Sequence, residues 1–145
     1  MRGVHAMSEH MRVGVDLARV ADVRHGIEAF GSRYLRRVFT EHEIASCAGS
    51  GTARESGLAA RFAAKEAMVK VLRLDDVAVD WRDVEVLRKP GGWTEIALHG
   101  DLARRAEVAG IHDTSVSMTH ENDIAVAVVV ATCRTPETAH DRPLI

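Results

Sequence analysis

The sequence contains few cysteines, and none has the spacing of a metal or redox motif. Cys47 and Cys133 are the two cysteines among 145 residues. They do not form the C-x-x-C pair of zinc and redox sites, and a small secreted disulfide scaffold would need more of them. The eight histidines show no H-E-x-x-H or comparable zinc spacing. We therefore interpret both cysteines as reduced, structural thiols.

Long hydrophobic runs are absent as well, which argues against a membrane partner. The longest apolar run, residues 124–131, is far shorter than the roughly 20 residues that a membrane-spanning helix needs. The first eleven residues are polar and lack the apolar segment of a signal peptide. We therefore expect a cytoplasmic protein.

The sequence has no excess of charge of one sign. Its 19 Lys and Arg against 21 Asp and Glu give a formal net charge of -2 at pH 7. No overall attraction to nucleic acid is expected, and any basic surface must be local. The length favours one compact domain. We expect it to span residues 12–133, with residues 1–11 as an extension and residues 134–145 as a tail outside the fold.

The hydrophobic pattern predicts an α+β fold, in which an antiparallel sheet packs against one long helix. Alternating or apolar segments flank tight turns, as in β-hairpins. The Ser-, Gly- and Thr-rich stretch 48–57 has no periodicity and is expected to be a surface loop. A strand is expected at 12–17, a hairpin that turns at 90–92 and a last strand pair that turns at 121–123. Helices are expected at 20–30, 56–72 and 101–110, and a further short helix begins at the capping box of Thr40 and Glu43.

Two strands are expected to have faces of different character. On the first, Val13 and Val15 lie opposite Gly14 and Asp16, so we expect Asp16 to point away from the core. On the last, one face has larger side chains and the other is small enough to let a helix approach closely. The small face consists of Ala125, Ala127, Val129 and Ala131.

The long helix carries charged residues next to its apolar stripe, which we expect to contain Leu58, Phe62, Val69 and Leu72. Glu66 and Lys70 are four residues apart and share one face beside Ala59 and Ala63, which would leave room for a ligand. An ordinary surface ion pair would have the same spacing. Lys65 projects into the apolar stripe and needs either a partner or a route to solvent.

Several polar residues have the chemistry of a phosphate and metal site. Asp16 and Glu66 could each give Mg2+ a hard oxygen ligand, with a substrate's phosphates completing the shell. Arg61, Lys65 and Lys70 together could form a cationic surface suited to phosphates. Taken singly, an aspartate that ends a strand is more often a turn former or a helix cap, and His120 a structural histidine.

Four segments in the same order and spacing resemble the signature blocks of holo-acyl-carrier-protein synthase, the small trimeric type of the 4'-phosphopantetheinyl transferase superfamily. They are G-V-D at 14–16, R-x-L-R-R-V-F-T-x-x-E at 33–43, R-F-A-A-K-E-A-M-V-K at 61–70 and S-M-T-H at 117–120. The resemblance covers about residues 12–132. It implies the fold of that superfamily.

The resemblance implies roles for the polar residues named above. Asp16 and Glu66 would bind Mg2+ together with the diphosphate of coenzyme A, and Lys70 would contact the phosphates that undergo transfer. Coenzyme A would also be bound by Arg61, Lys65 and His120. Glu121 is a weaker candidate for the metal.

The implied reaction is attack by a serine of an acyl carrier protein on the β-phosphorus of coenzyme A, which releases adenosine 3',5'-bisphosphate. Either Glu66 or a metal-held water would accept the serine proton. The product would serve fatty acid or polyketide synthesis, in a homotrimer with active sites between subunits. A coenzyme A-binding protein without transferase activity and a transferase for a secondary-metabolic carrier are the alternatives.

The resemblance also implies a basic surface around the first helix that binds the acidic carrier. The chain departs from the family here, because relatives often have Glu and Arg where this sequence has Arg19 and Asp22. An ordinary Arg19–Asp22 pair at helical spacing is the alternative role for these two residues. The expected carrier-binding residues are Arg19, Asp22, Arg33, Arg36 and Arg37.

Overall fold

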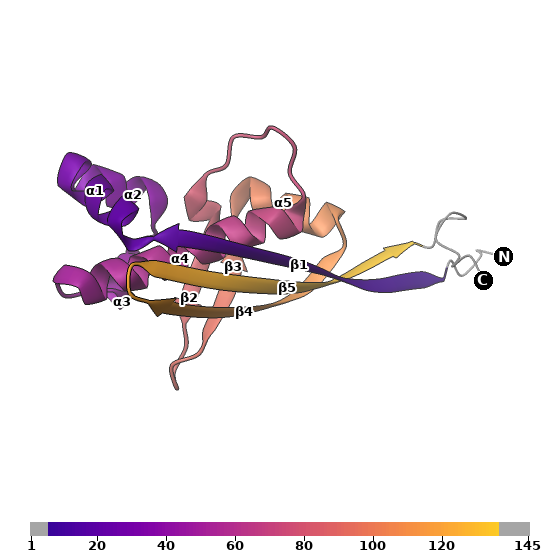
Figure 1. The fold of residues 1–145 in the computed structure, drawn as a ribbon. Coiled ribbons are helices and arrows are strands. Elements are labelled where there is room, and N and C mark those ends of the chain that lie inside the picture. The colour runs from indigo at the N-terminus through magenta and orange to yellow at the C-terminus, as the bar shows by residue number, and fades with distance from the viewer. Residues whose placement is uncertain (1–5, 137–145) are drawn as a thin grey trace.

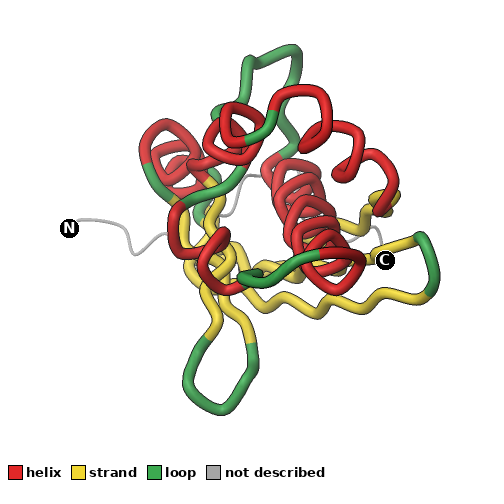
Figure 2. The backbone as a smooth tube through the Cα atoms, turned by 90° about the vertical axis from the view of Figure 1, so that its left-hand side faces the viewer, coloured by secondary structure: helices red, strands yellow, loops and turns green. Residues whose placement is uncertain are grey.

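The computed structural model describes residues 6–136, which fold into an α+β arrangement as expected (Figure 1). Helices gather on one side of the strands (Figure 2). The elements are β1 (Met7–Arg19), α1 (Val20–Phe30), α2 (Ser32–Val38), α3 (Glu41–Ser46), α4 (Gly51–Leu72), the 3-10 helix η1 (Trp81–Asp83), β2 (Val84–Arg88), β3 (Thr94–Leu98), α5 (Gly100–Val108), β4 (Ile111–Glu121) and β5 (Ile124–Pro136).

The main sheet is antiparallel, with β5 in the centre between β1 and β4, and the hairpin of β2 and β3 forms a second sheet. β1 pairs with β5 from Met7 opposite Pro136 to Arg19 opposite Ile124. The two strands extend as a ribbon past the helices (Figure 1). Residues 7–11 and 134–136 are therefore part of the sheet, although we expected them outside the fold. The rest of the expected extension and tail, residues 1–5 and 137–145, lies outside the described residues.

Helix α4 is longer than its sequence suggested. It begins at Gly51, so residues 51–57, expected as a loop, form its first two turns. An ion pair of 2.9 Å between Arg24 of α1 and Glu55 joins these turns to the neighbouring helix, and Ser56 is buried. Tertiary contacts thus override the weak helix propensity of a Gly- and Ser-rich segment.

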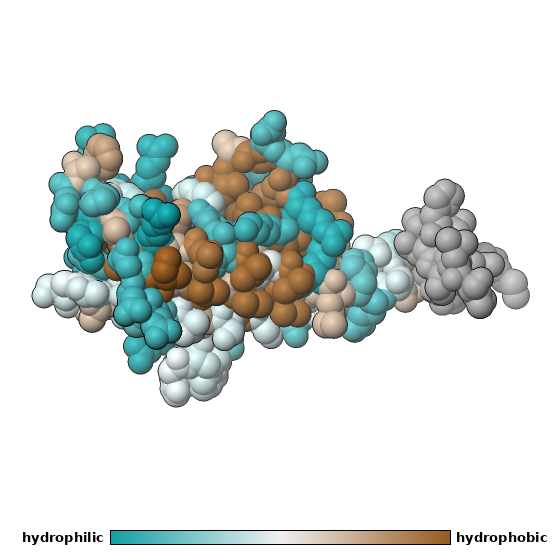
Figure 3. Space-filling view, in the orientation of Figure 1, coloured by the Kyte–Doolittle hydropathy of each residue, from teal (hydrophilic) through white to brown (hydrophobic). Residues whose placement is uncertain are grey.

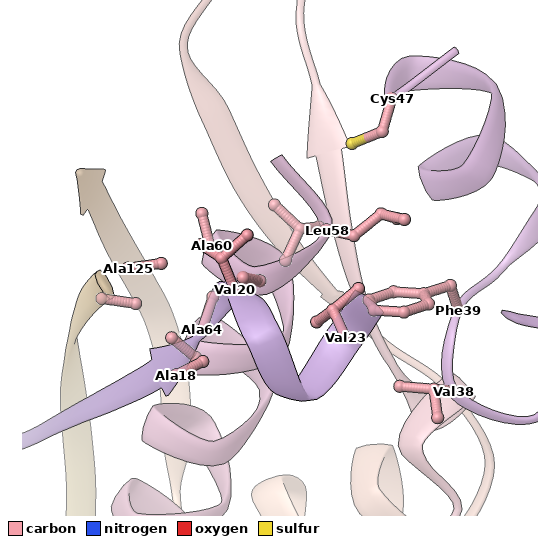
Figure 4. Packing of buried hydrophobic residues seen from close by; sticks show 14 of the residues in the cluster. Ala18, Val20, Val23, Val38, Phe39, Cys47, Leu58, Ala60, Ala64 and Ala125 are labelled. Atoms are coloured by element: carbon pink, nitrogen blue, oxygen red, sulfur yellow. The ribbon is translucent and has the colours of Figure 1, made fainter. Parts of the chain in front are cut away.

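The core depends on small residues between α4 and the sheet. Ala59, Ala63 and Ala67 are fully buried, and they face the small side of β5 as expected. In one cluster of the hydrophobic core, Ala60 and Ala64 pack with Val20, Val23 and Phe39 (Figure 4). We expected Ala59 and Ala63 to leave room for a ligand beside Glu66. This expectation was wrong, because the sheet covers both alanines.

Gly14 marks the closest approach of β1 to α4. A Cβ atom built on Gly14 would overlap the carbonyl oxygen of Ala67. This contact turns the Gly14 face of β1 toward the helix, so Val13 and Val15 point outward and are 69% and 52% exposed. Our expectation that Asp16 points away from the helical side was wrong. Close packing of β1 on α4, rather than burial of the larger valines, therefore decides which face of the strand meets the helix.

The opposite face of the sheet is left uncovered in the single chain. Met11, Val13, Val15 and Leu17 of β1 are exposed, and the valines of β5 on this side are half-buried. The face appears as a continuous hydrophobic area over the middle of the molecule (Figure 3). Exposed apolar areas of this kind mark interaction surfaces.

A buried ion pair joins α3, α4 and the segment around β2. The Nζ atom of Lys65 lies 2.8 Å from Oε2 of Glu43, and both side chains are fully buried. Lys65 also donates hydrogen bonds to the carbonyl oxygens of Trp81 and Val84. Burial lowers the pKa of Lys65, while the charge of Glu43 and its hydrogen bond oppose this effect.

Glu43 satisfies its remaining hydrogen-bonding capacity from the backbone. Its two oxygens accept hydrogen bonds of 2.8 Å from the amides of Thr40 and Val86. The first of these bonds completes the expected capping box at the start of α3. The partner that Lys65 required is therefore a carboxylate that also caps α3 and binds the Val86 amide in β2.

Replacing Lys65 with Met should lower the free energy of unfolding by about 3–5 kcal/mol, because Glu43 would stay buried without its counter-charge. Lys70→Met is the control, since Lys70 is exposed and its ion pair contributes about 1 kcal/mol or less. Urea denaturation followed by circular dichroism, at one protein concentration, measures both. Equal losses in the two variants would contradict this role for Lys65.

Candidate active site

Asp16 lies on the helical side of β1, beside Lys70. Its Oδ1 atom is 3.0 Å from Nζ of Lys70, which also donates a 2.9 Å hydrogen bond to the carbonyl oxygen of Val15. The other carboxylate oxygen, Oδ2, is buried and has no hydrogen-bond partner within residues 6–136. A buried, unpaired anionic oxygen is costly, so this atom is suited to a ligand of positive charge.

Glu66 belongs to the same region, as the packing of α4 on β1 shows. Gly14 touches Ala67, and Ala18 lines a cavity together with Glu66. Asp16 lies between Gly14 and Ala18 on the same face of the strand, and therefore opposite the part of α4 that carries Glu66. Glu66 is half-buried and makes no hydrogen bond or ion pair to another described residue, since Lys70 pairs with Asp16 instead.

Two carboxylates from different elements fit an Mg2+ site that a substrate would complete. Among residues 6–136 no group of three or more His, Cys, Asp or Glu side chains could hold a metal ion. Mg2+ commonly uses one or two carboxylates together with substrate phosphates and water. The unpaired Oδ2 of Asp16 and the free carboxylate of Glu66 match this requirement.

A cavity of about 450 Å3 opens next to Glu66. Its walls come from β1, α1, α2, α4 and the start of β5. Burial, and then the charge of Asp22, raise the pKa of Tyr34, which keeps the Tyr34 hydroxyl neutral. The lining residues are Leu17, Ala18, Arg19, Asp22, Val23, Tyr34, Phe62, Glu66 and Ile124.

Two of the expected cationic residues do not lie on an open surface. Lys65 is fully buried in its ion pair with Glu43, so we withdraw it as a coenzyme A-binding residue. Arg61 is buried and donates a 3.1 Å hydrogen bond to the carbonyl oxygen of Gly57, although its Nε atom has no partner among the described residues. The expected surface of three cations is therefore wrong, because only Lys70 is exposed.

Arg61 is turned toward Cys47 at the end of α3. Burial raises the pKa of the Cys47 thiol, and the charge of Arg61 opposes this shift. Both cysteines are free and buried, which agrees with structural thiols.

His120 and Glu121 lie on opposite faces of β4. His120 pairs with Ala125, which pairs in turn with Ala18, so His120 shares the helical side of the sheet with Asp16. Glu121 is the next residue of the strand and points to the other face. This alternation argues against Glu121 as a ligand at Asp16. No hydrogen bond or ion pair between described residues joins His120 to Arg61.

The arginines of α2 form an exposed basic surface. Arg36 and Arg37 line a groove of about 340 Å3 with Arg82 of η1, and Arg33 and Arg37 line a smaller cavity. Arg19 and Asp22 are exposed at the start of α1 and form no ion pair with each other or with another described residue. The alternative role of an Arg19–Asp22 pair is thus not found.

Sequence reasoning missed two aromatic residues at this site, Tyr34 and Phe62. Phe62 packs against the core, as expected for the apolar stripe, and it also lines the cavity one turn before Glu66. Tyr34 reaches the cavity from α2, and no spacing in the sequence relates it to Glu66. Tyr34 belongs to the family block 33–43, in which only the arginines, Thr40 and Glu43 carried a predicted role.

Comparison with known proteins identifies the class to which this fold and site belong. Residues 12–129 match the sequence family of the 4'-phosphopantetheinyl transferase superfamily, and the chain belongs to it. The expected fold and enzyme class, a phosphopantetheinyl transferase, are thereby confirmed.

Within the superfamily the chain is similar to holo-[acyl-carrier-protein] synthases. The synthase of Chloroflexus aurantiacus is 39% identical over 130 residues, which cover 81% of this chain and 95% of the relative. The synthase of Desulforudis audaxviator is 43% identical over 119 residues, covering 82% and 90%. The resemblance seen in the four sequence blocks is confirmed.

Solved structures of the same type share the fold. A coenzyme A complex of the synthase from Chronobacterium ammoniagenes superposes with a TM-score of 0.75 at 27% identity, covering 86% of this chain and 98% of that chain. The Helicobacter pylori synthase in complex with coenzyme A gives 0.71 at 25% identity, covering 83% and 99%.

Among the described residues, no helix is long and apolar enough to cross a membrane.

Proposed function

We propose that this chain transfers the 4'-phosphopantetheine group of coenzyme A to a serine of an apo acyl carrier protein, in the cytoplasm and for fatty acid or polyketide synthesis. The observation that carries the proposal is the pair of available carboxylates from β1 and α4, Asp16 and Glu66, with Lys70 beside them. The names of the relatives and their coenzyme A complexes support the choice of substrates.

The reaction is a phosphoryl transfer. The serine Oγ forms a bond to the β-phosphorus, and the bond from that phosphorus to the oxygen bridging toward the α-phosphate breaks. Adenosine 3',5'-bisphosphate leaves with that oxygen, and the serine proton passes to a base. Little covalent chemistry is required of the protein, so positioning and charge neutralisation dominate.

The side chains divide this work. Asp16 and Glu66 would hold Mg2+, which when bound supplies charge neutralisation at the diphosphate. Lys70, already 3.0 Å from Asp16, brings a positive charge to the phosphates. Glu66 also has no competing partner among the described residues and is our candidate for the base that takes the serine proton. On the family resemblance, His120 and Arg61 are the candidates for the nucleotide end, and of these two Arg61 is buried in the single chain.

Asp16→Asn and Glu66→Gln should each lower transfer to an apo-carrier by about three orders of magnitude, because each removes several kcal/mol of charge stabilisation. Thermal unfolding should change little, since neither side chain holds the core. Mass spectrometry of the carrier after incubation with coenzyme A and Mg2+ measures the transfer. Glu121→Gln is the control and should retain activity.

The alternative of a coenzyme A-binding protein makes a different prediction in the same assay. It requires binding of coenzyme A by the wild-type chain without modification of any apo-carrier in a panel. That result would contradict the proposed function.

The carrier-binding surface is the second part of the proposal. Arg19, Arg33, Arg36 and Arg37 supply positive charge on α1 and α2, and Asp22 interrupts it. Complementary charge mainly sets the association rate and the choice of partner, and salt weakens it. Asp22, which has no ion-pair partner among the described residues, is free to repel an acidic carrier.

Asp22→Arg should lower the KM for a strongly acidic carrier, and Arg37→Glu should raise it, by up to about tenfold at low salt. Both effects should shrink at high salt. Arg88→Glu, which changes an exposed arginine on β2, controls for net charge. Unchanged carrier kinetics of Asp22→Arg at low salt would move the recognition surface elsewhere.

The third part of the proposal is a homotrimer that buries the uncovered face of the sheet. Met11, Val13, Val15 and Leu17 form a larger exposed apolar row than a solvated strand requires. The last strand contributes its valines to the same face.

Light scattering should give the mass of three chains for the wild type, and Val13→Glu should dissociate the assembly, since the new carboxylate would be buried without a partner. Val108→Glu, at an apolar position on α5 that is 79% exposed, should not. A fully active monomer would overturn the trimer.

A further inference from the structure

A second basic cavity, of about 460 Å3, lies between the first half of β1, the end of α4 and the end of α5. Four arginines line it, and one carboxylate, Asp75, lines it as well. The cavity shares no lining residue with the cavity of the candidate active site or with the grooves formed by the arginines of α2. The four arginines are Arg12, Arg73, Arg104 and Arg105.

The cavity keeps an excess of positive charge after its ion pairs are taken into account. Arg104 and Arg105 share one partner, Asp101, at 2.6 and 2.7 Å. Arg73 is exposed, and its side chain forms no ion pair or hydrogen bond with another described residue. Two carboxylates, Asp75 and Asp101, thus face four guanidinium groups, which favours an anionic ligand.

Arg12 reaches the cavity from the helical side of β1. One of its terminal nitrogens donates a 3.2 Å hydrogen bond to the carbonyl oxygen of Val71, near the end of α4. Its Nε atom is buried and has no hydrogen-bond partner within residues 6–136. The protein therefore satisfies this guanidinium group only in part. Arg12 lies two residues before Gly14, on the side of the sheet opposite the exposed apolar row proposed for the trimer.

Arg73 has a backbone conformation that favours glycine. It directly follows α4, and its φ of 53° and ψ of 49° lie in the left-handed region. Helices often end with glycine at this position, because a side chain is strained there. Arginine is thus a less stable choice than glycine for this turn. Strain of this kind suggests a role for the side chain itself.

The remaining lining of the cavity is largely apolar. Leu74, Val77 and Val108 contribute to it, and Val108 is 79% exposed. The planar guanidinium group matches pairs of phosphate oxygens, and the volume is that of a small-molecule site. An inorganic ion would leave the apolar part without a contact. A molecule with a phosphate at one end and an apolar body at the other fits both parts of the lining.

We propose that this cavity binds a small molecule that carries a phosphate group and an apolar body, in addition to the coenzyme A of the candidate active site. Arg73 follows Lys70 by three residues, so a bound ligand would contact the turn of α4 that continues from the candidate active site. The site does not depend on the proposed transferase function, because no transfer step passes through it.

Isothermal titration calorimetry with phenyl phosphate and with inorganic phosphate, in buffer without Mg2+, tests the site. The wild type should bind phenyl phosphate about fivefold more tightly, because the ring buries apolar surface against Val108. Arg73→Gly should weaken the binding of both probes by about tenfold, since a charge-assisted hydrogen bond is lost. Val108→Ser should weaken the binding of phenyl phosphate alone.

The Arg73→Gly variant also separates binding from folding. Because glycine relieves the backbone strain, the thermal midpoint of the ligand-free protein should stay the same or rise. Arg88→Gln, which changes an exposed arginine of β2 outside the cavity, should leave both affinities unchanged. Lys70→Met should leave them unchanged too, because Lys70 belongs to the candidate active site.

Other results would overturn the proposed ligand site. No binding of either probe would do so, as would equal affinities for the two. Unchanged affinities in Arg73→Gly with a lower thermal midpoint would mean that the arginines only stabilise the ends of the helices. Loss of binding in Lys70→Met but not in Arg73→Gly would move the ligand to the candidate active site. Binding of a hexaglutamate peptide but not of phenyl phosphate would indicate an acidic protein partner instead.

Discussion

The close packing of α4 against the sheet is the constraint on which the other features depend. Alanine on the helix, Gly14 on β1 and small residues on β5 bring the two backbones close together. A strand has two faces, so once Gly14 meets the helix, Asp16 must share that side. The same choice exposes Val13 and Val15. The position of Asp16 and the exposed apolar face thus both result from the contact of Gly14 with α4.

The rotation of α4 about its axis needs a further restraint, because a row of alanines permits sliding. The Lys65–Glu43 pair supplies it. Lys65 can reach its carboxylate and two carbonyl oxygens only in one orientation of the helix. Glu66 is the next residue, so the orientation that buries Lys65 also directs Glu66 toward the cavity. Because a buried pair adds little net stability, we infer that the role of this one is to fix the orientation of α4.

The sequence predicted the architecture well and the site in part, and the reasons differ by residue. Capping, turn chemistry and periodicity are local, so the box at Thr40 and the turn at 90–92 could be located from neighbours alone. The direction of Asp16 was missed because alternation defines two faces of a strand but not which one a helix covers. The role of Lys65 was open for a similar reason, since its partner Glu43 is distant in sequence.

The two lysines of α4 differ in how firmly their partners hold them. Lys65 is enclosed by three partners without solvent, and removing it from them would leave a buried carboxylate unpaired. Lys70 has a half-exposed side chain, 56% accessible, and its pairing with Asp16 is of the kind that contributes little to stability. Phosphate oxygens can therefore replace Asp16 as its partner at small cost. The helix thus carries one fixed charge, at Lys65, and one charge, at Lys70, that can exchange its partner.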